Sequence, residues 1–308
     1  MDKCIMNSRQ KNYIVTQCYG NEGIFYECAF ALLSISRLYD KSFLPDTEIW
    51  IYTDKPEWFS RFKDCPLPLH FRQMDERTIA QWKGDNNFVH RFKIELLHDL
   101  AQGKQGNILY MDTDVILTHD IASMLTNIGK GELYMHVQEG RVSDGGNPVL
   151  KKLSAFLDSS SEMKSTDHGI AQTYMWNAGV LGFKTMHIPL LEKVLALTDK
   201  MYKLYPKHVV EQFCFSYYFQ KTRNVKSAAP YIIHYWNLKE MREVFSSFFD
   251  HFKHASWAEL TILASLLQPH IYIQEKANFY AGRSIAGKLK KDKWHPLIPD
   301  WQQLLHQL

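Results

Sequence analysis

The segment NILYMDTDVIL, residues 107–117, places two aspartates one residue apart in a run that otherwise favours a buried strand. Asp112 and Asp114 stand at positions i and i+2, so an extended chain directs both carboxylates to the same side. Clustered carboxylates repel each other and lose hydration unless a cation joins them. Oxygen ligands suit a hard divalent ion such as Mn²⁺ or Mg²⁺, which typically completes its shell with substrate phosphates and water. The pair therefore predicts a metal site for a diphosphate, and the alternative is a turn-capping Asp112 beside a solvated Asp114.

The elements that must position this pair alternate along the chain. Strand patterns at 13–18 and 47–54 flank helical spacing at 24–39, and a turn-rich stretch at 64–71 suggests another short strand. Helical periodicity returns at 88–101, directly before the aspartate segment. This order predicts an α/β fold with a doubly wound mixed sheet flanked by helices, in which ligands lie beyond the carboxyl ends of the strands.

Composition excludes several classes of protein. The 308 residues are 45% hydrophobic and 22% charged, close to the globular average, so neither a disordered chain nor a fibre is expected. A net charge of +3 is too small to predict nucleic-acid binding. We find neither a secretory leader nor an apolar run long enough to span a membrane, so we expect a cytoplasmic protein. The five cysteines form no C-x-x-C pair and are predicted to be reduced core thiols.

A longer pattern surrounds the two aspartates. The stretch YMDTDVILTHDIASML, which begins at Tyr110, resembles the donor-site motif of nucleotide-sugar glycosyltransferases with the GT-A fold, most closely that of glycosyltransferase family 8. In that family an acidic residue after the apolar run starts a short helix, as Asp120 would here. The resemblance implies a GT-A fold, a UDP-sugar donor and a saccharide or glycolipid acceptor such as a lipopolysaccharide. It also implies metal-dependent transfer with retention of the anomeric configuration.

Two further segments resemble the sugar-binding parts of the family. YMWNAGVLGFK resembles its Asn-Ser/Ala-Gly segment, which implies that Asn177 bonds sugar hydroxyls and that Gly179 lets the backbone approach closely. VVEQFCFSYYF resembles its Asp-Gln helix, with Glu211 in place of the aspartate. The implied catalytic residues are Asn177, Glu211 and Gln212, with Gln212 nearest the anomeric carbon. The alternatives are a strand bulge at Gly179 and two exposed residues that open an amphipathic helix.

The segment YIIHYWNLKEM adds candidate ligands for the metal and the phosphates. By the same resemblance, His234 would be the third protein ligand of the metal. Lys239 echoes a lysine of the family, one residue early, which implies a contact with the donor phosphates. The alternatives are an imidazole satisfied in the core and a solvated lysine.

Residues near the first strands and the helix at 88–101 are implied to bind the nucleotide. Thr16, Gln17 and Tyr19 would contact the base and ribose, and Asp54 would take a hydrogen bond from either. Lys93 matches a basic residue that lies over the donor in the family, and the alternative is one cation on a solvated helix face.

The chemistry and the remaining segments leave several alternatives open. No residue stands out as a covalent nucleophile. We therefore expect the acceptor to attack the face of the sugar from which the diphosphate leaves, with the leaving phosphate as the base. Gln212 and Asp167 would be neighbours of the reacting bond. A haloacid-dehalogenase-like phosphatase would instead use Asp112 as its nucleophile. A third alternative is a non-catalytic module that binds a sugar nucleotide or calcium.

The segment 139–153, with adjacent glycines, would be a mobile lid or a disordered connection.

We expect two parts in the chain. Residues 1–240 would form the GT-A catalytic domain, with a nucleotide-binding half at about 1–120 and an acceptor half at about 121–240. Residues 241–308 would form a helical extension rich in aromatic side chains and, near 288–293, in lysine. Such an extension either packs on the domain or makes peripheral contact with the inner face of an anionic membrane.

Overall fold

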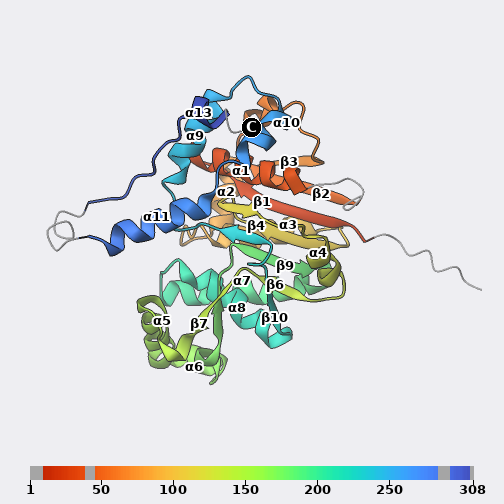
Figure 1. Cartoon of the computed structure of the whole chain (residues 1–308). Coiled ribbons are helices and arrows are strands. Elements are labelled where there is room, and N and C mark those ends of the chain that lie inside the picture. The colour runs from red at the N-terminus through yellow and green to blue at the C-terminus, as the bar shows by residue number, and fades with distance from the viewer. Residues whose placement is uncertain (1–9, 39–45, 284–291, 306–308) are drawn as a thin grey trace, which may run out of the picture.

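A seven-stranded sheet forms the centre of the computed structural model, which describes residues 10–38, 46–283 and 292–305 (Figure 1). The strands lie in the order β10-β6-β9-β4-β1-β2-β3. Neighbours pair in parallel except at β9, which runs antiparallel to both β4 and β6. The strands of this sheet are β1 (Asn12–Cys18), β2 (Thr47–Thr53), β3 (Leu69–Gln73), β4 (Asn107–Met111), β6 (Leu133–Met135), β9 (Val180–Lys184) and β10 (Val225–Ser227).

Helices cover both faces of this sheet. Because successive side chains of a strand point to opposite faces, Ile14 and Val15 of β1 enter two separate hydrophobic clusters. The first cluster includes α1, α9 and α10, and the second includes α3, α7 and α8, on the other side of the sheet in Figure 1. The doubly wound mixed sheet predicted from the sequence is therefore confirmed. The helices are α1 (Glu22–Leu38), α2 (Glu76–Lys83), α3 (Arg91–Ala101), α4 (Ala122–Gly129), α5 (Pro148–Ser159), α6 (Ser161–Thr166), α7 (Ile188–Leu204), α8 (Val209–Thr222), α9 (Met241–His251), α10 (Trp257–Ala264), α11 (Pro269–Ala281) and α13 (Trp301–Leu305).

The aspartate segment is divided between two sheets. β4 ends at Met111, and after the two aspartates the chain continues as β5 (Val115–Leu117), which leaves the central sheet. β5 pairs antiparallel with β11 (Ile232–His234), and His234 lies opposite Val115 in this pairing. The small second sheet thereby brings a distant histidine to the carboxyl end of β4.

The segment 139–153 is not a disordered connection. Its first residues belong to β7 (Gln138–Arg141), which pairs antiparallel with β8 (Tyr174–Trp176). Its last residues begin α5, where the Asn147 side chain accepts hydrogen bonds at 2.9 Å from the backbone N–H groups of Val149 and Leu150. This cap satisfies N–H groups that have no partner inside the helix, so the segment has a defined conformation.

The C-terminal helices pack on the first helix of the chain. Phe245 of α9 stacks on Phe30 of α1 with ring centroids 4.2 Å apart, and both side chains belong to the same core cluster. The Trp257 indole of α10 donates a hydrogen bond to Ser36 at 2.8 Å. Packing on the domain, one of the two expected alternatives, is therefore what α9 and α10 do. Much of the lysine-rich stretch near 288–293 lies outside the described residues.

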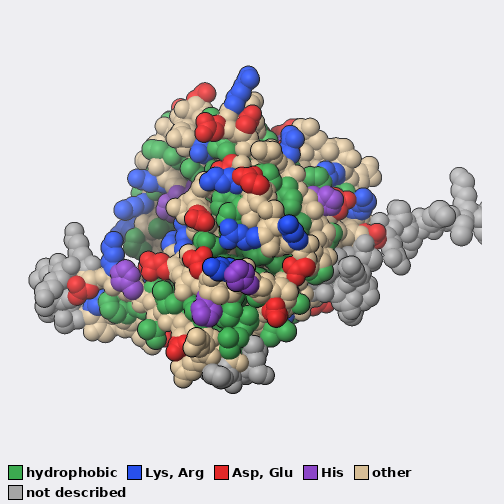
Figure 2. All heavy atoms as spheres, turned by 90° about the horizontal axis from the view of Figure 1, so that it is seen from above, with side chains coloured by type: hydrophobic (Ala, Val, Ile, Leu, Met, Phe, Trp, Pro, Cys, Tyr) green, Lys and Arg blue, Asp and Glu red, His purple; other side chains and the backbone are tan. Residues whose placement is uncertain are grey.

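The outer face over these C-terminal helices carries mixed charge. Figure 2 shows acidic and basic side chains interspersed there among apolar ones. Within the described ranges, no helix combines the length and the apolar character needed to cross a membrane. Peripheral membrane contact through this region stays a prediction.

The cysteines agree with the expected reduced thiols where the structure describes them. Cys18, Cys28 and Cys214 are buried free thiols, and Cys65 is a half-buried one. Cys4 lies outside the described residues.

Candidate functional site

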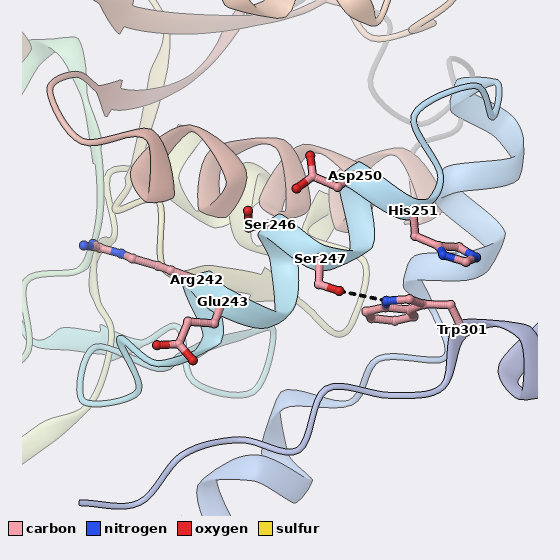
Figure 3. A pocket seen from close by; sticks show the side chains of 7 residues that line it. All are labelled: Arg242, Glu243, Ser246, Ser247, Asp250, His251 and Trp301. Atoms are coloured by element: carbon pink, nitrogen blue, oxygen red, sulfur yellow. Dashed lines mark hydrogen bonds between the residues drawn. The ribbon is translucent and has the colours of Figure 1, made fainter.

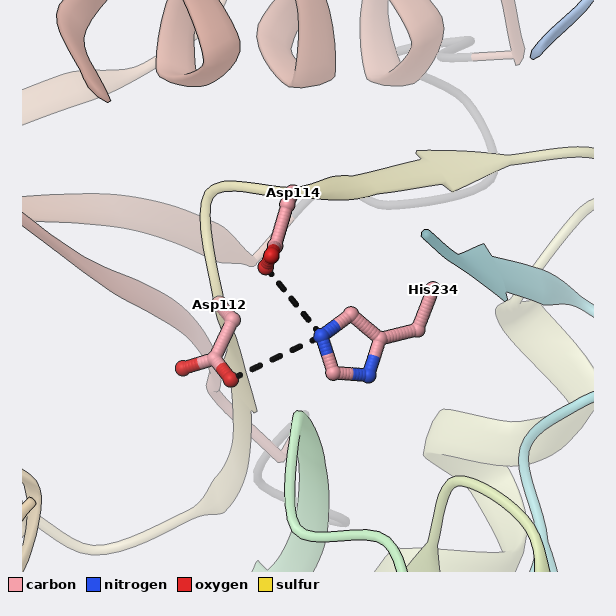
Figure 4. Close-up of side chains that lie close together, drawn as sticks. All are labelled: Asp112, Asp114 and His234. Atoms are coloured by element: carbon pink, nitrogen blue, oxygen red, sulfur yellow. Dashed lines mark hydrogen bonds and ion pairs between the residues drawn. The ribbon is translucent and has the colours of Figure 1, made fainter. Parts of the chain in front are cut away.

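Asp112, Asp114 and His234 converge at the carboxyl end of β4 (Figure 4). The His234 Nε2 atom lies 3.1 Å from Asp114 Oδ1 and 3.8 Å from Asp112 Oδ2. One ligand atom from each of the three side chains can be chosen so that all lie within 4.8 Å of one another. Two carboxylates and an imidazole form a donor set that suits Mn²⁺ or Mg²⁺.

The orientation of the imidazole fits a bound cation. His234 Nδ1 lies 2.8 Å from Asn177 Oδ1, and this oxygen also accepts a hydrogen bond from the Gly179 N–H at 3.0 Å. Because Asn177 Oδ1 is an acceptor, Nδ1 carries the proton in the neutral ring and Nε2 presents its lone pair. That lone pair faces two carboxylates, an arrangement that is repulsive unless a proton or a metal ion lies between them. Asn177 therefore orients the imidazole as the outer hydrogen-bond partners of metal-binding histidines do.

Gly179 is needed where the chain passes the imidazole. A Cβ atom at this position would overlap the His234 ring. The Gly179 carbonyl also accepts a hydrogen bond from the Asp112 N–H at 2.8 Å, which ties β9 to the aspartate loop. The sequence predicted that the backbone comes close to the donor sugar at this glycine, which stays a prediction; the neighbour that needs the space in the structure is His234.

Asp114 stays ionised although it is buried. Burial alone would raise the pKa of this carboxyl, but His234 and Lys239 outweigh it and hold the pKa well below its usual range. The Lys239 ammonium lies 2.5 Å from Asp114 Oδ2, with more than half of its side chain exposed. A cation of the protein thus stands beside the candidate metal ligands, at the mouth of a cavity.

This cavity has a volume of about 870 Å³ and collects most of the residues predicted from the sequence. They come from the ends of β1 and β4, from α3 and α8, and from the segments around Gly179 and His234. The predicted residues that line it are Gln17, Tyr19, Lys93, Asp112, Asp114, Asn177, Glu211, Gln212, His234 and Lys239.

Three predicted neighbours of the donor do not line the cavity. Thr16 lies within β1, where it is 8% exposed and pairs with Ile51 of β2. Asp54 accepts a hydrogen bond at 3.1 Å from the Gly20 N–H, so it holds the turn after β1. Asp167 forms an ion pair with Lys221 and accepts a hydrogen bond from Tyr217. The contacts of Thr16 and Asp54 with the nucleotide, and the place of Asp167 near the reacting bond, stay predictions.

Lys93 and Glu211 form a buried ion pair in the cavity wall. The Lys93 ammonium lies 3.3 Å from Glu211 and 3.5 Å from Asp112, and it donates to the Ala178 carbonyl at 2.9 Å. Both residues are 2% exposed, so the alternatives of a solvated lysine and an exposed glutamate are excluded. Burial raises the pKa of Glu211 to about 7 against the opposing effect of Lys93. For Lys93, burial would lower the pKa, but Asp112 and Glu211 outweigh it and raise the pKa.

Sequence reasoning missed Glu139 and Trp236. Glu139 accepts hydrogen bonds from Gln212 Nε2 at 2.8 Å and from Asn177 Nδ2 at 3.3 Å, so it connects two of the predicted sugar-binding amides. It lies in the segment that the sequence presented only as a glycine-rich loop. Trp236 lines the cavity with 55% of its surface exposed, two residues after His234. An exposed tryptophan so close to a candidate ligand was a signal that could have identified it.

The motifs and the geometry now permit comparison with known proteins. Residues 91–188 match the sequence model of Glycosyl transferase family 8. The predicted resemblance to this family is confirmed over that segment, which contains Lys93, Asp112, Asp114 and Asn177. Glu139, Asp167 and Gly179 also lie in this segment, whereas the candidates of β1, α8 and the segment around His234 lie beyond it. No curated protein sequence matches the chain.

Several solved glycosyltransferases align with this chain at low sequence identity. The glycosyltransferase GlyE of Streptococcus pneumoniae aligns at 15% identity and a TM-score of 0.47 over 82% of this chain, which spans only 62% of the length of GlyE. Mouse xyloside xylosyltransferase 1 aligns at 10% identity and a TM-score of 0.47 over 70% of this chain and 84% of its own. Core-mannan synthase A of Aspergillus fumigatus aligns at 9% identity and a TM-score of 0.48 over 76% of this chain and 77% of its own.

Proposed function

We propose that this protein transfers a sugar from a UDP-sugar to a saccharide or glycolipid acceptor, with a divalent metal ion and with retention of the anomeric configuration. The observation that carries the proposal is the convergence of Asp112, Asp114 and His234 at one cavity. The family 8 match over residues 91–188 supports sugar transfer as the reaction. UDP, metal dependence and retention come from the resemblance stated above.

The residues divide the work of binding the donor. Asp112, Asp114 and His234 would hold Mn²⁺ or Mg²⁺, which when bound neutralises the charge that develops on the leaving diphosphate. Lys239 supplies a second positive charge beside Asp114. Gln17 and Tyr19 would contact the nucleoside from the end of β1. In this arrangement the diphosphate lies between the nucleobase, at the end of β1, and the bond to the sugar that is transferred.

The sugar would be recognised by amide side chains. Gln212 offers an amide to the cavity, and its Nε2 atom is held by Glu139 at 2.8 Å. The buried pair of Lys93 and Glu211 keeps α3 and α8 together behind the aspartates. A wall fixed in this way orients donor hydroxyls without rearrangement during transfer, which lowers the cost of reaching the transition state.

One measurement separates this proposal from the two alternatives. The purified protein is incubated with UDP-sugars and Mn²⁺, and the release of UDP is followed, with EDTA and the variant Asp112→Asn as controls. Metal-dependent UDP release that D112N loses supports the transferase. Phosphate release from phosphomonoesters without UDP release would favour the phosphatase, and tight UDP-sugar binding without any turnover would favour a non-catalytic module.

A cytoplasmic location and peripheral membrane contact through residues 241–308 belong to the same proposal. Sedimentation with anionic vesicles tests the contact, because binding through lysines weakens as the salt concentration rises.

A further inference from the structure

A buried ion pair lies directly behind the aspartate loop, residues 112–114 between β4 and β5. Glu27 of α1 is fully buried, and its Oε2 atom accepts a hydrogen bond at 2.9 Å from Arg242 Nη2. The same oxygen lies 3.4 Å from the hydroxyl of Thr113, the residue between the two aspartates. Ionised groups are rarely buried without a partner, because dehydration of the charge is costly. Glu27 therefore joins three segments: α1, the aspartate loop and the first turn of α9.

Local backbone structure makes room for the arginine. Gly23 lies one helical turn before Glu27 on α1, and a Cβ atom there would stand 2.7 Å from Arg242 Cδ. The absence of a side chain at Gly23 lets the stem of Arg242 cross the start of α1. Figure 3 shows Arg242 projecting from the beginning of α9, away from the other labelled side chains of that helix.

The guanidinium has hydrogen-bonding capacity beyond this pair. It carries five N–H donors in a planar fork, and the bond to Glu27 uses one of them. Its Nε atom is buried and has no hydrogen-bond partner within the part of the chain that the structure describes. The side chain is 28% exposed and lines the same cavity as Asp112, Asp114 and Lys239. A rigidly held, half-buried guanidinium at a cavity is well suited to bind an anion.

The charges around the cavity indicate which anion. Lys239 precedes α9 and Arg242 lies in its first turn, three residues later, and both interact electrostatically with Asp114. Two cationic side chains therefore line the cavity beside the candidate metal ligands, where they could contact an anionic group that a bound metal ion also holds. We propose that Arg242 binds the diphosphate of the nucleotide-sugar donor and that Glu27 is the positioning residue that fixes its guanidinium. This inference rests on the proposed function, because it assigns a further contact in the same donor site.

Binding measurements with ligands of different charge test the assignment. Calorimetric titrations in Mn²⁺ compare UDP, UMP and uridine on the wild type and on Arg242→Gln. Loss of a charge-assisted contact is expected to weaken UDP by about ten- to hundredfold and to leave uridine unchanged. R242K, which keeps the charge and most of the stem, is expected to lose less UDP affinity and serves if R242Q does not fold. Glu27→Gln is expected to reduce the preference for UDP over uridine by a smaller factor.

Lys276→Gln is the matched control. Lys276 also anchors the start of α9, through an ion pair with Glu240 at 2.7 Å, but it does not line the cavity. K276Q should bind UDP as the wild type does. UDP binding by R242Q and R242K equal to the wild type would overturn the inference alone, and so would an equal loss of UDP and uridine. A wild type that binds no UDP in Mn²⁺ would overturn the proposed function and this inference together.

Discussion

The ammonium of Lys93 and the carboxylate of Glu211 lie 3.3 Å apart, and both are almost completely shielded from solvent. This pair joins α3 to α8, and Asp112 lies 3.5 Å from the same ammonium. The candidate metal site is therefore supported from behind by a cation of the protein. Because Lys93 and Glu211 are buried, we expect the stability of the protein to depend on both side chains and on pH.

Substitution of Lys93 tests the support for the aspartates. Lys93→Met would leave Glu211 and Asp112 without their buried cation, and breaking a buried pair from one side typically costs about 3–5 kcal/mol. Urea unfolding should show this loss. Lys193→Met, at an exposed position of α7, should change the free energy of unfolding by less than about 0.5 kcal/mol. Equal stability of the two variants would contradict the role assigned to Lys93.

The pKa of Glu211 predicts a pH dependence of stability. Burial raises this pKa from the ordinary 4.5 to about 7. Between these values the folded chain holds a proton that the unfolded chain has released, so the free energy of unfolding falls as pH rises. The wild type should therefore lose stability relative to Glu211→Gln as pH rises through this window. Urea titrations of both proteins at several pH values measure the difference, and parallel profiles would show that Glu211 titrates normally.

Gly179→Ala should damage the metal site more than the fold. The new Cβ would overlap the His234 imidazole and displace it from the two aspartates. A ligand at a hundred times its Kd stabilises the folded state by about 2.7 kcal/mol, so Mn²⁺ should raise the melting temperature of the wild type. We expect both G179A and His234→Ala to lose this rise. A normal Mn²⁺ shift in G179A would contradict the contact between the two residues.

Phe245→Ala tests whether the segment after residue 240 is an independent part. Phe245 is fully buried against Phe30, and removal of a core aromatic ring typically costs about 3–5 kcal/mol. Because α9 and α1 share one cluster, calorimetry of F245A should show the main unfolding transition shifted to lower temperature. A separate early transition, with the main one unchanged, would indicate an extension that folds by itself.

The sequence predicted β1, β2 and β4 because their residues follow apolar or alternating strand patterns, and it predicted α1 and α3 because their periodicity is clear. It did not identify the short strands β6 and β10 of the same sheet. The aspartates, Asn177 and His234 could be identified since they belong to recognisable segments. The structure added why they meet: β11 pairs with β5, and Gly179 makes room for the imidazole.

Glu27 and Glu139, which sequence reasoning missed, belong to no such pattern. Glu27 sits among apolar residues of α1, and only the position of Arg242, far along the chain, explains why a charge is buried there. Glu139 acquires a role through its contact with Gln212 across the cavity. Thr16 and Asp54 do not line the cavity, because a position near the end of a strand does not decide whether a side chain faces the cavity or the backbone of the next turn. Such long-range relationships depend on tertiary packing, which local patterns do not encode.

Anomalous diffraction from crystals grown with Mn²⁺ and UDP tests the central claim most directly. The account predicts an anomalous peak at coordination distance, about 2.0–2.3 Å, from carboxylate oxygens of Asp112 and Asp114 and from His234 Nε2, with the diphosphate of UDP on the cavity side of the ion. Ordered UDP in the cavity with no peak at these three side chains, or a peak elsewhere on the protein, would contradict it.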